Sequence, residues 1–172
     1  ASYRRQRQMC IRDSYGTTEQ DGTAEVILGQ GLGNHRQDVV ISTKFGRNPT
    51  ENNAPNFHAK RLLDSVDASL NRIGTDYIDV LFFHSPFSRD EIYDDVWEAI
   101  GRVKEAGKVR FIGHSISMFQ DTQQICRDWA NERKIDVIQV VYSLMNRESR
   151  QLIADLGPVS YTHLRAHETV VH

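Results

Sequence analysis

Hydrophobic residues in this chain form short continuous runs that alternate with longer amphipathic stretches. The runs cover residues 38–43, 77–83, 109–113 and 135–141, and within each run the apolar positions are mostly continuous rather than alternating with polar ones. Such runs are typical of strands that are buried on both faces, as in parallel sheets. The pattern therefore predicts a parallel sheet built from these runs.

The stretches between the runs have the spacing of amphipathic helices. From residue 59 to 73, apolar side chains recur every three or four positions, which predicts a helix with one buried face. The same spacing from 92 to 103 predicts a second helix, and a third is predicted from about 119 to 132. Ser88 and Glu91 have the spacing of a capping box before the second helix.

Strand, loop and helix repeat at roughly 30 residues, the length of a βαβ unit. Right-handed crossovers then allow an open doubly wound sheet or a (β/α)8 barrel. Lys44, His84 and Ser115 come at the carboxyl ends of predicted strands, where barrels carry their chemistry. An open sheet would usually bind its ligand through a glycine-rich turn, G-x-G-x-x-G, and the sequence contains none. The barrel is therefore the favoured architecture.

Composition excludes several classes of function. The chain has 172 residues and a net charge of −2, so nucleic acid and membrane surfaces are not expected partners. No apolar run approaches the roughly 20 residues of a membrane span. Cys10 and Cys126 cannot form a disulfide framework, which favours a reducing, cytoplasmic setting. No metal site is expected, because no group of Cys, His and carboxylate residues has ligand spacing.

Each candidate site residue allows two interpretations when it is taken alone. Lys44 is either a surface lysine just past a strand or a charge that tunes a neighbouring acid. His84 is either a core histidine bonded to a backbone carbonyl or a donor aimed at a reacting oxygen. Tyr15 is either a routine turn residue or a proton donor.

Several motifs occur in order between about residue 15 and residue 158. They are YG at 15–16 followed by Glu25, LG at 28–29 and Leu32; ISTKFG at 41–46; SL at 69–70 with Arg72, Gly74, DYID at 76–79 and His84; GKVRFIG at 107–113; and Gln139, Tyr142 and NR at 146–147. Together, these motifs resemble those of the aldo-keto reductases. The resemblance implies a (β/α)8 barrel that reduces small-molecule aldehydes or ketones with NADPH.

The resemblance also implies a role for each candidate residue. Tyr15 would donate a proton to the carbonyl oxygen as hydride attacks the carbonyl carbon. An unperturbed tyrosine hydroxyl is a weak acid with a pKa near ~10, and the Lys44 ammonium would strengthen it by stabilising the phenolate. His84 would orient the carbonyl through a hydrogen bond. Ser115 and Gln139 would bind the carboxamide of the nicotinamide, although the asparagine that follows this serine in the family is replaced here by isoleucine.

Both ends depart from the family pattern. The family has an aspartate five residues before the tyrosine, in D-T-A-x-x-Y-G, and here the first three of these positions read Cys-Ile-Arg. RRQRQMCIRD at 4–13 and VSYTHLRAHET at 159–169 can each be encoded in frame by adapter DNA used in transposase-based shotgun sequencing. We therefore expect residues 1–14 and 159–172 to be non-native flanks of a partial barrel domain, residues 15–158.

This domain would run from the end of the second barrel strand through the sixth strand. A complete barrel needs about 250 residues, so the chain by itself is expected to be inactive, with exposed edge strands near Val39 and Val140. Two alternatives to the reductase are a non-catalytic nucleotide-binding relative, such as a channel regulatory subunit, and an inert truncated product. Substrate identity and oligomeric state stay open.

Overall fold

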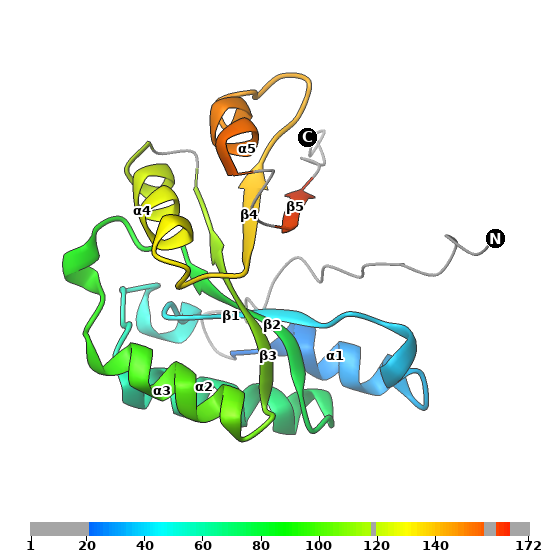
Figure 1. Ribbon diagram of the computed structural model, residues 1–172. Helices are drawn as coiled ribbons and strands as arrows, with labels where there is room; N and C mark the ends of the chain where they lie inside the picture. Colours follow the sequence, from blue (N-terminus) through cyan, green and yellow to red (C-terminus); the bar gives the residue numbers. More distant parts are fainter. Residues whose placement is uncertain (1–20, 118–119, 157–160, 166–172) are drawn as a thin grey trace.

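The strands form one parallel sheet whose spatial order follows the chain. A computed structural model describes residues 21–117, 120–156 and 161–165. The strand order is β1-β2-β3-β4-β5, and every neighbouring pair is parallel. The strands are β1 (Ser42–Phe45), β2 (Ile78–His84), β3 (Val109–Ser115), β4 (Val137–Val141) and β5 (Tyr161–Arg165) (Figure 1).

A helix precedes the first strand and one connects each later pair, so the described chain is a series of βα units. A doubly wound sheet reverses its strand order at a switch point, whereas this order never reverses, as in the wall of a (β/α)8 barrel. The structure thus confirms the predicted choice of a partial barrel. The helices are α1 (Thr23–Leu32), α2 (Ala59–Ile73), α3 (Asp95–Glu105), α4 (Gln120–Asn131) and α5 (Arg150–Leu156), with 3-10 turns at Arg36–Asp38, Pro49–Glu51 and Arg89–Glu91.

The predicted runs all contain strands, but two expectations about the strands were wrong. The first strand begins at Ser42 rather than 38, because Arg36–Asp38 forms a 3-10 turn, and Lys44 consequently lies inside the strand. β4 was expected to be an exposed edge near Val140, yet it pairs with β5 over its whole length. β5 occupies residues within the segment that was predicted to be adapter-derived.

The helix at 59–73 has the predicted bounds, but the second helix starts later than its pattern suggested. α3 begins at Asp95, and residues 89–91 form a separate 3-10 turn. The predicted capping box is absent: the Ser88 side chain makes no capping bond, and the Glu91 carboxylate accepts a hydrogen bond from the Phe87 amide at 3.2 Å. The 3-10 turn therefore replaces the first turn of the predicted helix.

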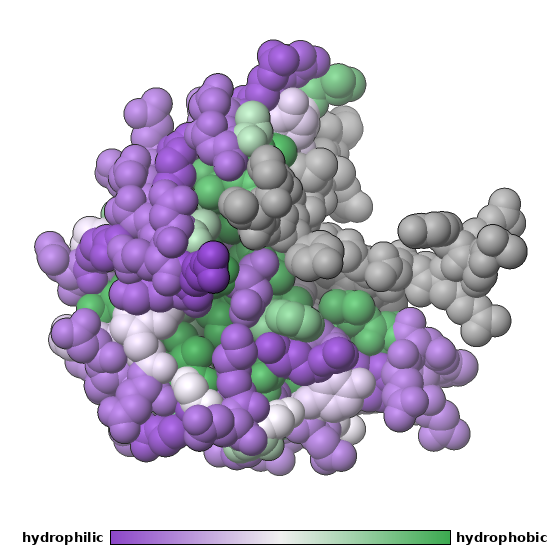
Figure 2. All heavy atoms as spheres, in the orientation of Figure 1, coloured by the Kyte–Doolittle hydropathy of each residue, from purple (hydrophilic) through white to green (hydrophobic). Residues whose placement is uncertain are grey.

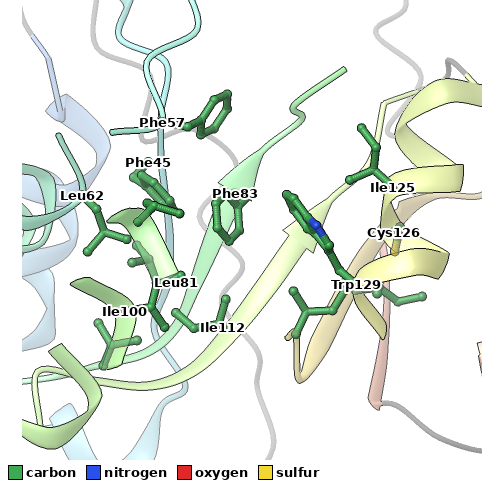
Figure 3. Packing of buried hydrophobic residues seen from close by; sticks show 14 of the residues in the cluster. Phe45, Phe57, Leu62, Leu81, Phe83, Ile100, Ile112, Ile125, Cys126 and Trp129 are labelled. Atoms are coloured by element: carbon green, nitrogen blue, oxygen red, sulfur yellow. The ribbon is translucent and has the colours of Figure 1, made fainter. Parts of the chain in front are cut away.

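The main hydrophobic core lies between the sheet and its helices. Phe83 of β2 is at its centre, with ring centroids 4.8 Å from Phe45 and 4.9 Å from Trp129 of α4. Leu62 of α2 and Ile100 of α3 close the same core from the helix side (Figure 3). Burying these side chains stabilises the fold by about 1.5 to 3 kcal/mol each. Because buried positions are therefore apolar, the strands and helices leave a hydrophobic pattern in the sequence.

A buried carboxylate ties α1 to β1 and α2. Glu25 accepts hydrogen bonds from Thr43, from Ser69 at 2.8 Å and from Arg72 at 2.6 Å. Its side chain is 5% exposed, so the arginine supplies the charge compensation that a buried carboxylate requires. Glu25, Ser69 and Arg72 belong to the family motifs, and their contacts here are structural.

A second buried carboxylate holds the amino-terminal end of the sheet. Asp79 of β2 accepts hydrogen bonds from Arg36 and Arg110, both at 2.9 Å, and from the Ile41 amide at 2.9 Å. Arg36 also lies over the ring of Tyr77, 3.7 Å from its centroid. The DYID motif therefore joins strands at the end opposite to His84.

Hydrophobic side chains reach the surface on the face drawn in Figure 2. Polar side chains (purple) cover the helices at its margins, and hydrophobic residues (green) lie between them. Phe111 of β3 and Val40 before β1 are exposed by 43% and 37%. Among the described helices, none has both the length and the apolarity that crossing a membrane requires.

Candidate active site

Three predicted site residues form one row across the sheet. His84 ends β2, Ser115 ends β3, and Gln139 lies in the middle of β4. His84 and Ser115 are direct register partners, and so are Ser115 and Gln139. All three are buried, with exposures of 8%, 6% and 2%. The row follows from parallel pairing, which brings the carboxyl ends of successive strands to the same edge of the sheet.

Lys44 lies on the same face of the sheet as this row. Its register partner on β2 is Phe82, two residues before His84. Side chains alternate along a strand, so Phe82 and His84 point to one side and Lys44 shares that side. The Lys44 residue is half-buried. An ammonium and an imidazole thus come from adjacent strands at one end of the sheet.

Ser115 and Gln139 contact each other directly. The Ser115 hydroxyl donates a hydrogen bond to Oε1 of Gln139 at 3.0 Å. Ile116, at the position of the family asparagine, instead belongs to the hydrophobic core and is 3% exposed. The polar groups at these positions are therefore the serine hydroxyl and the glutamine side chain.

His114 lies on the other face of β3 and does not join the row. Its register partner is Phe83, and its ring lies 5.1 Å from the Trp129 ring in an edge-on contact. The side chain is fully buried, and neither ring nitrogen has a hydrogen-bond partner among the residues that the structure describes. Burial lowers the pKa of His114 to about 3, because charging the ring would cost its solvation. This histidine is neutral at physiological pH.

The loop after β1 brings an arginine to the row. Gly46 has a φ of +101°, and a Cβ at this position would lie 2.0 Å from the Phe57 ring, so the turn requires glycine. Arg47 follows and donates from Nε to the carbonyl oxygen of His84 at 3.0 Å. Sequence reasoning did not single out Arg47. The only available signal was its place directly after the ISTKFG motif.

The structure brings together Lys44, His84, Ser115 and Gln139. Tyr15, the remaining predicted site residue, lies outside the described residues. No cluster of metal-ligating side chains occurs within the ranges that the structure describes. Chemically, the assembled groups can supply a positive charge, an imidazole hydrogen bond and a polar pair suited to an amide.

Comparison with known proteins gives matches over most of the chain. The model of the Aldo/keto reductase family matches residues 11–156. An aldo-keto reductase of Mycobacterium sp. (strain KMS) is 30% identical over 164 residues, which cover 91% of this chain and 55% of the relative. The chain thus spans about half the length of this curated relative.

Other relatives carry more specific names. A protein of Arabidopsis thaliana named as a probable voltage-gated potassium channel subunit beta is 33% identical over 121 residues, 69% of this chain and 36% of that protein. The NADH-specific methylglyoxal reductase of Escherichia coli (strain K12) is 30% identical over 141 residues, 73% of this chain and 42% of that enzyme.

Solved structures give the same fold. The holo form of an aldo-keto reductase from Bacillus halodurans superposes with a TM-score of 0.71 at 23% sequence identity. The superposition covers 83% of this chain and 47% of that chain. The shared part is about half of that chain, in agreement with a partial barrel.

Proposed function

The chain belongs to the aldo/keto reductase family, and on that premise we propose that the complete protein reduces aldehydes or ketones with a nicotinamide cofactor. The observation that carries this proposal is the row of His84, Ser115 and Gln139 with Lys44 on the same face of the sheet. We further propose NADPH as the preferred cofactor, while the Escherichia coli relative is named as NADH-specific.

Two residues of the row suit the nicotinamide end of the cofactor. A carboxamide has one acceptor oxygen and two donor hydrogens, and Ser115 and Gln139 offer a hydroxyl and an amide that are joined at 3.0 Å. The cofactor supplies the hydride when it is bound. Ser115 and Gln139 would fix the ring in one orientation, and their burial keeps water from competing for the same hydrogen bonds.

The other two residues suit the carbonyl oxygen of the substrate. As hydride reaches the carbonyl carbon, this oxygen gains negative charge and needs donors. His84 would donate a hydrogen bond to the oxygen, and Tyr15 would transfer the proton. Lys44, on the strand next to His84, would stabilise the phenolate left on Tyr15.

The test replaces Tyr15 in the complete protein. Tyr15→Phe keeps the ring and removes the proton, so turnover with a reactive aldehyde should fall roughly 100- to 10,000-fold, with cofactor affinity little changed. Tyr77→Phe is the matched control, because Tyr77 packs under Arg36 at the far end of the sheet. Near-normal turnover of Tyr15→Phe would remove Tyr15 from its role.

A second candidate function is a non-catalytic regulatory subunit, which the Arabidopsis relative's name favours. The two candidates differ in one measurement. A reductase oxidises NADPH only when a carbonyl compound is present, whereas a regulatory subunit would bind the cofactor and turn over little or none of it.

We also propose that the chain of 172 residues is a poor catalyst by itself. It spans 55% of the Mycobacterium relative, so much of the barrel wall and its loops would be supplied by residues beyond this chain. Segments 1–14 and 159–172 are proposed to be non-native. The nucleotide sequence tests this directly, because codons other than those of the adapters at residues 4–13 would refute it.

A further inference from the structure

Arg47 forms hydrogen bonds with the backbone at the end of β2, where His84 is the last residue. Its Nε donates to the His84 carbonyl at 3.0 Å, and its Nη2 donates to the Ser85 carbonyl at 3.2 Å. Nη1 donates to the Asn53 carbonyl at 3.0 Å. One guanidinium thus joins the loop after β1 to the end of β2. Its side chain is only 15% exposed, so these bonds are largely shielded from water.

A carboxylate and an aromatic ring also lie next to the Arg47 guanidinium. The Glu91 carboxylate lies 3.7 Å from Nη2, and the guanidinium carbon lies 5.3 Å from the centroid of the Phe87 ring. Both residues come from the segment that follows β2. A planar guanidinium with several fixed donors can hold two consecutive carbonyls in one geometry, which a lysine cannot reproduce.

The backbone beyond His84 needs such support. Ser85 has a φ of +50°, in the left-handed region that non-glycine residues rarely adopt, and Pro86 follows it. Conformations of this kind cost about 1 to 3 kcal/mol and persist only where surrounding contacts fix them. Besides the bond from Arg47, the Ser85 hydroxyl donates to the Ser115 carbonyl at 2.9 Å. The turn is therefore fixed from both neighbouring strands.

We propose that Arg47 is a positioning residue that sets the direction of the His84 imidazole. Fixing the carbonyls of His84 and Ser85 fixes the peptide plane between them, and with it the backbone from which the His84 side chain projects. This inference rests on the proposed function for its catalytic consequence. Arg47 itself would contact neither substrate nor cofactor.

The first test reads the position of His84 without requiring activity. In the complete protein, the His84 ring signals are assigned by NMR from their loss in His84→Leu. Arg47→Met should shift or broaden these signals, and Arg47→Lys should do so less. Arg61→Met is the control: Arg61 has a similar exposure of 19% and pairs with Glu51 at 3.2 Å. Unchanged His84 signals in the folded Arg47 variants would overturn the proposal.

The second test measures turnover in a double-mutant cycle. Arg47→Met should lower kcat roughly 10- to 100-fold, because a misplacement of about 1 Å has effects of this size, while the KM for cofactor changes little. In a His84→Leu background the same substitution should have almost no effect, since the group that it positions is gone. Equal losses in both backgrounds would mean that Arg47 does not act through His84.

The two tests separate the inference from the function on which it rests. If the complete protein shows no carbonyl-dependent oxidation of the cofactor, the proposed reductase fails, and the NMR comparison still decides whether Arg47 positions His84. If Arg47→Met does not fold, Arg47→Lys provides the comparison, because it keeps the charge and loses the fork of donors.

Discussion

His84 and His114 lie on adjacent strands, both buried, and their surroundings differ completely. His84 is the register partner of Ser115 and faces the side of the sheet that carries Lys44 and Gln139. His114 precedes Ser115 by one residue, and its ring packs against Trp129 in the core. A single step along a strand reverses the face of the sheet. Closeness to a strand end therefore does not identify a site residue unless the face is known as well.

The same contrast occurs within β1. Thr43 donates to the buried Glu25 carboxylate on the helix side, whereas Lys44 faces the polar row. Neighbouring residues of β1 thus have a structural role and a proposed catalytic role. The following predictions test this division by matched substitutions in the complete protein.

The largest effect is expected from Lys44→Met compared with Thr43→Val. Lys44→Met should reduce turnover by about 100-fold or more, because the proton donor loses the charge that stabilises its anion. Thr43→Val should leave kcat within about a factor of three and lower the free energy of unfolding by about 1 to 3 kcal/mol, since Glu25 loses a hydrogen bond. Steady-state kinetics and urea unfolding measure the two effects. A catalytic loss in Thr43→Val as large as that in Lys44→Met would break the division.

The next largest effect on turnover is expected when the same substitution, histidine to leucine, is made at His84 and at His114. His84→Leu should lower kcat by roughly 100-fold, the usual cost of removing one donor to a developing oxyanion. His114→Leu should leave kcat nearly unchanged and stabilise the protein by about 1 kcal/mol at neutral pH, because it removes two buried ring nitrogens that have no partner within the described part of the chain. If His114→Leu abolished turnover while the protein stayed folded, the face of the strand would not separate the two roles.

The smallest effect concerns the dependence of stability on pH. The pKa of His114 is about 3 in the folded state against an ordinary value of 6.5. Between these values the unfolded chain binds a proton that the folded chain excludes, so stability falls as the pH drops below about 6.5. The contribution is about 1.4 kcal/mol per pH unit within this window. Unfolding curves at pH 7 and pH 5 should differ less for His114→Leu than for the unchanged protein, and identical differences would contradict the assignment.

Much of the fold was predictable from local patterns. The apolar residues that recur every three or four positions over 59–73 predicted the bounds of α2, because an amphipathic helix has apolar side chains on its buried face at every turn. The sequence also predicted that Lys44, His84 and Ser115 lie near strand ends, since each of these polar residues interrupts or follows an apolar run. The boundaries of β1 and α3 were not readable, because 3-10 turns at Arg36–Asp38 and Arg89–Glu91 depend on contacts that no local pattern records.

The contacts of the candidate site were less predictable. Arg47 reaches carbonyl oxygens about forty positions away along the chain, and its own surroundings in the sequence are ordinary for a loop. The pairing of β4 with β5 was likewise not expected, because the sequence of residues 161–165 has little apolar content. Hydrogen bonds between the backbones of two strands can form without a run of apolar residues.

The sequence by itself determined the family, the alternation of strands and helices, and the identity of the polar residues near the strand ends, because each of these depends on residue type and short-range spacing. Only the tertiary structure decided which polar residues share a face. Register and the alternation of side chains place His84, Ser115 and Gln139 in one row with Lys44 on the same side. They bury His114 on the opposite face, against Trp129. A one-residue difference in register would reverse these assignments without changing the sequence at all.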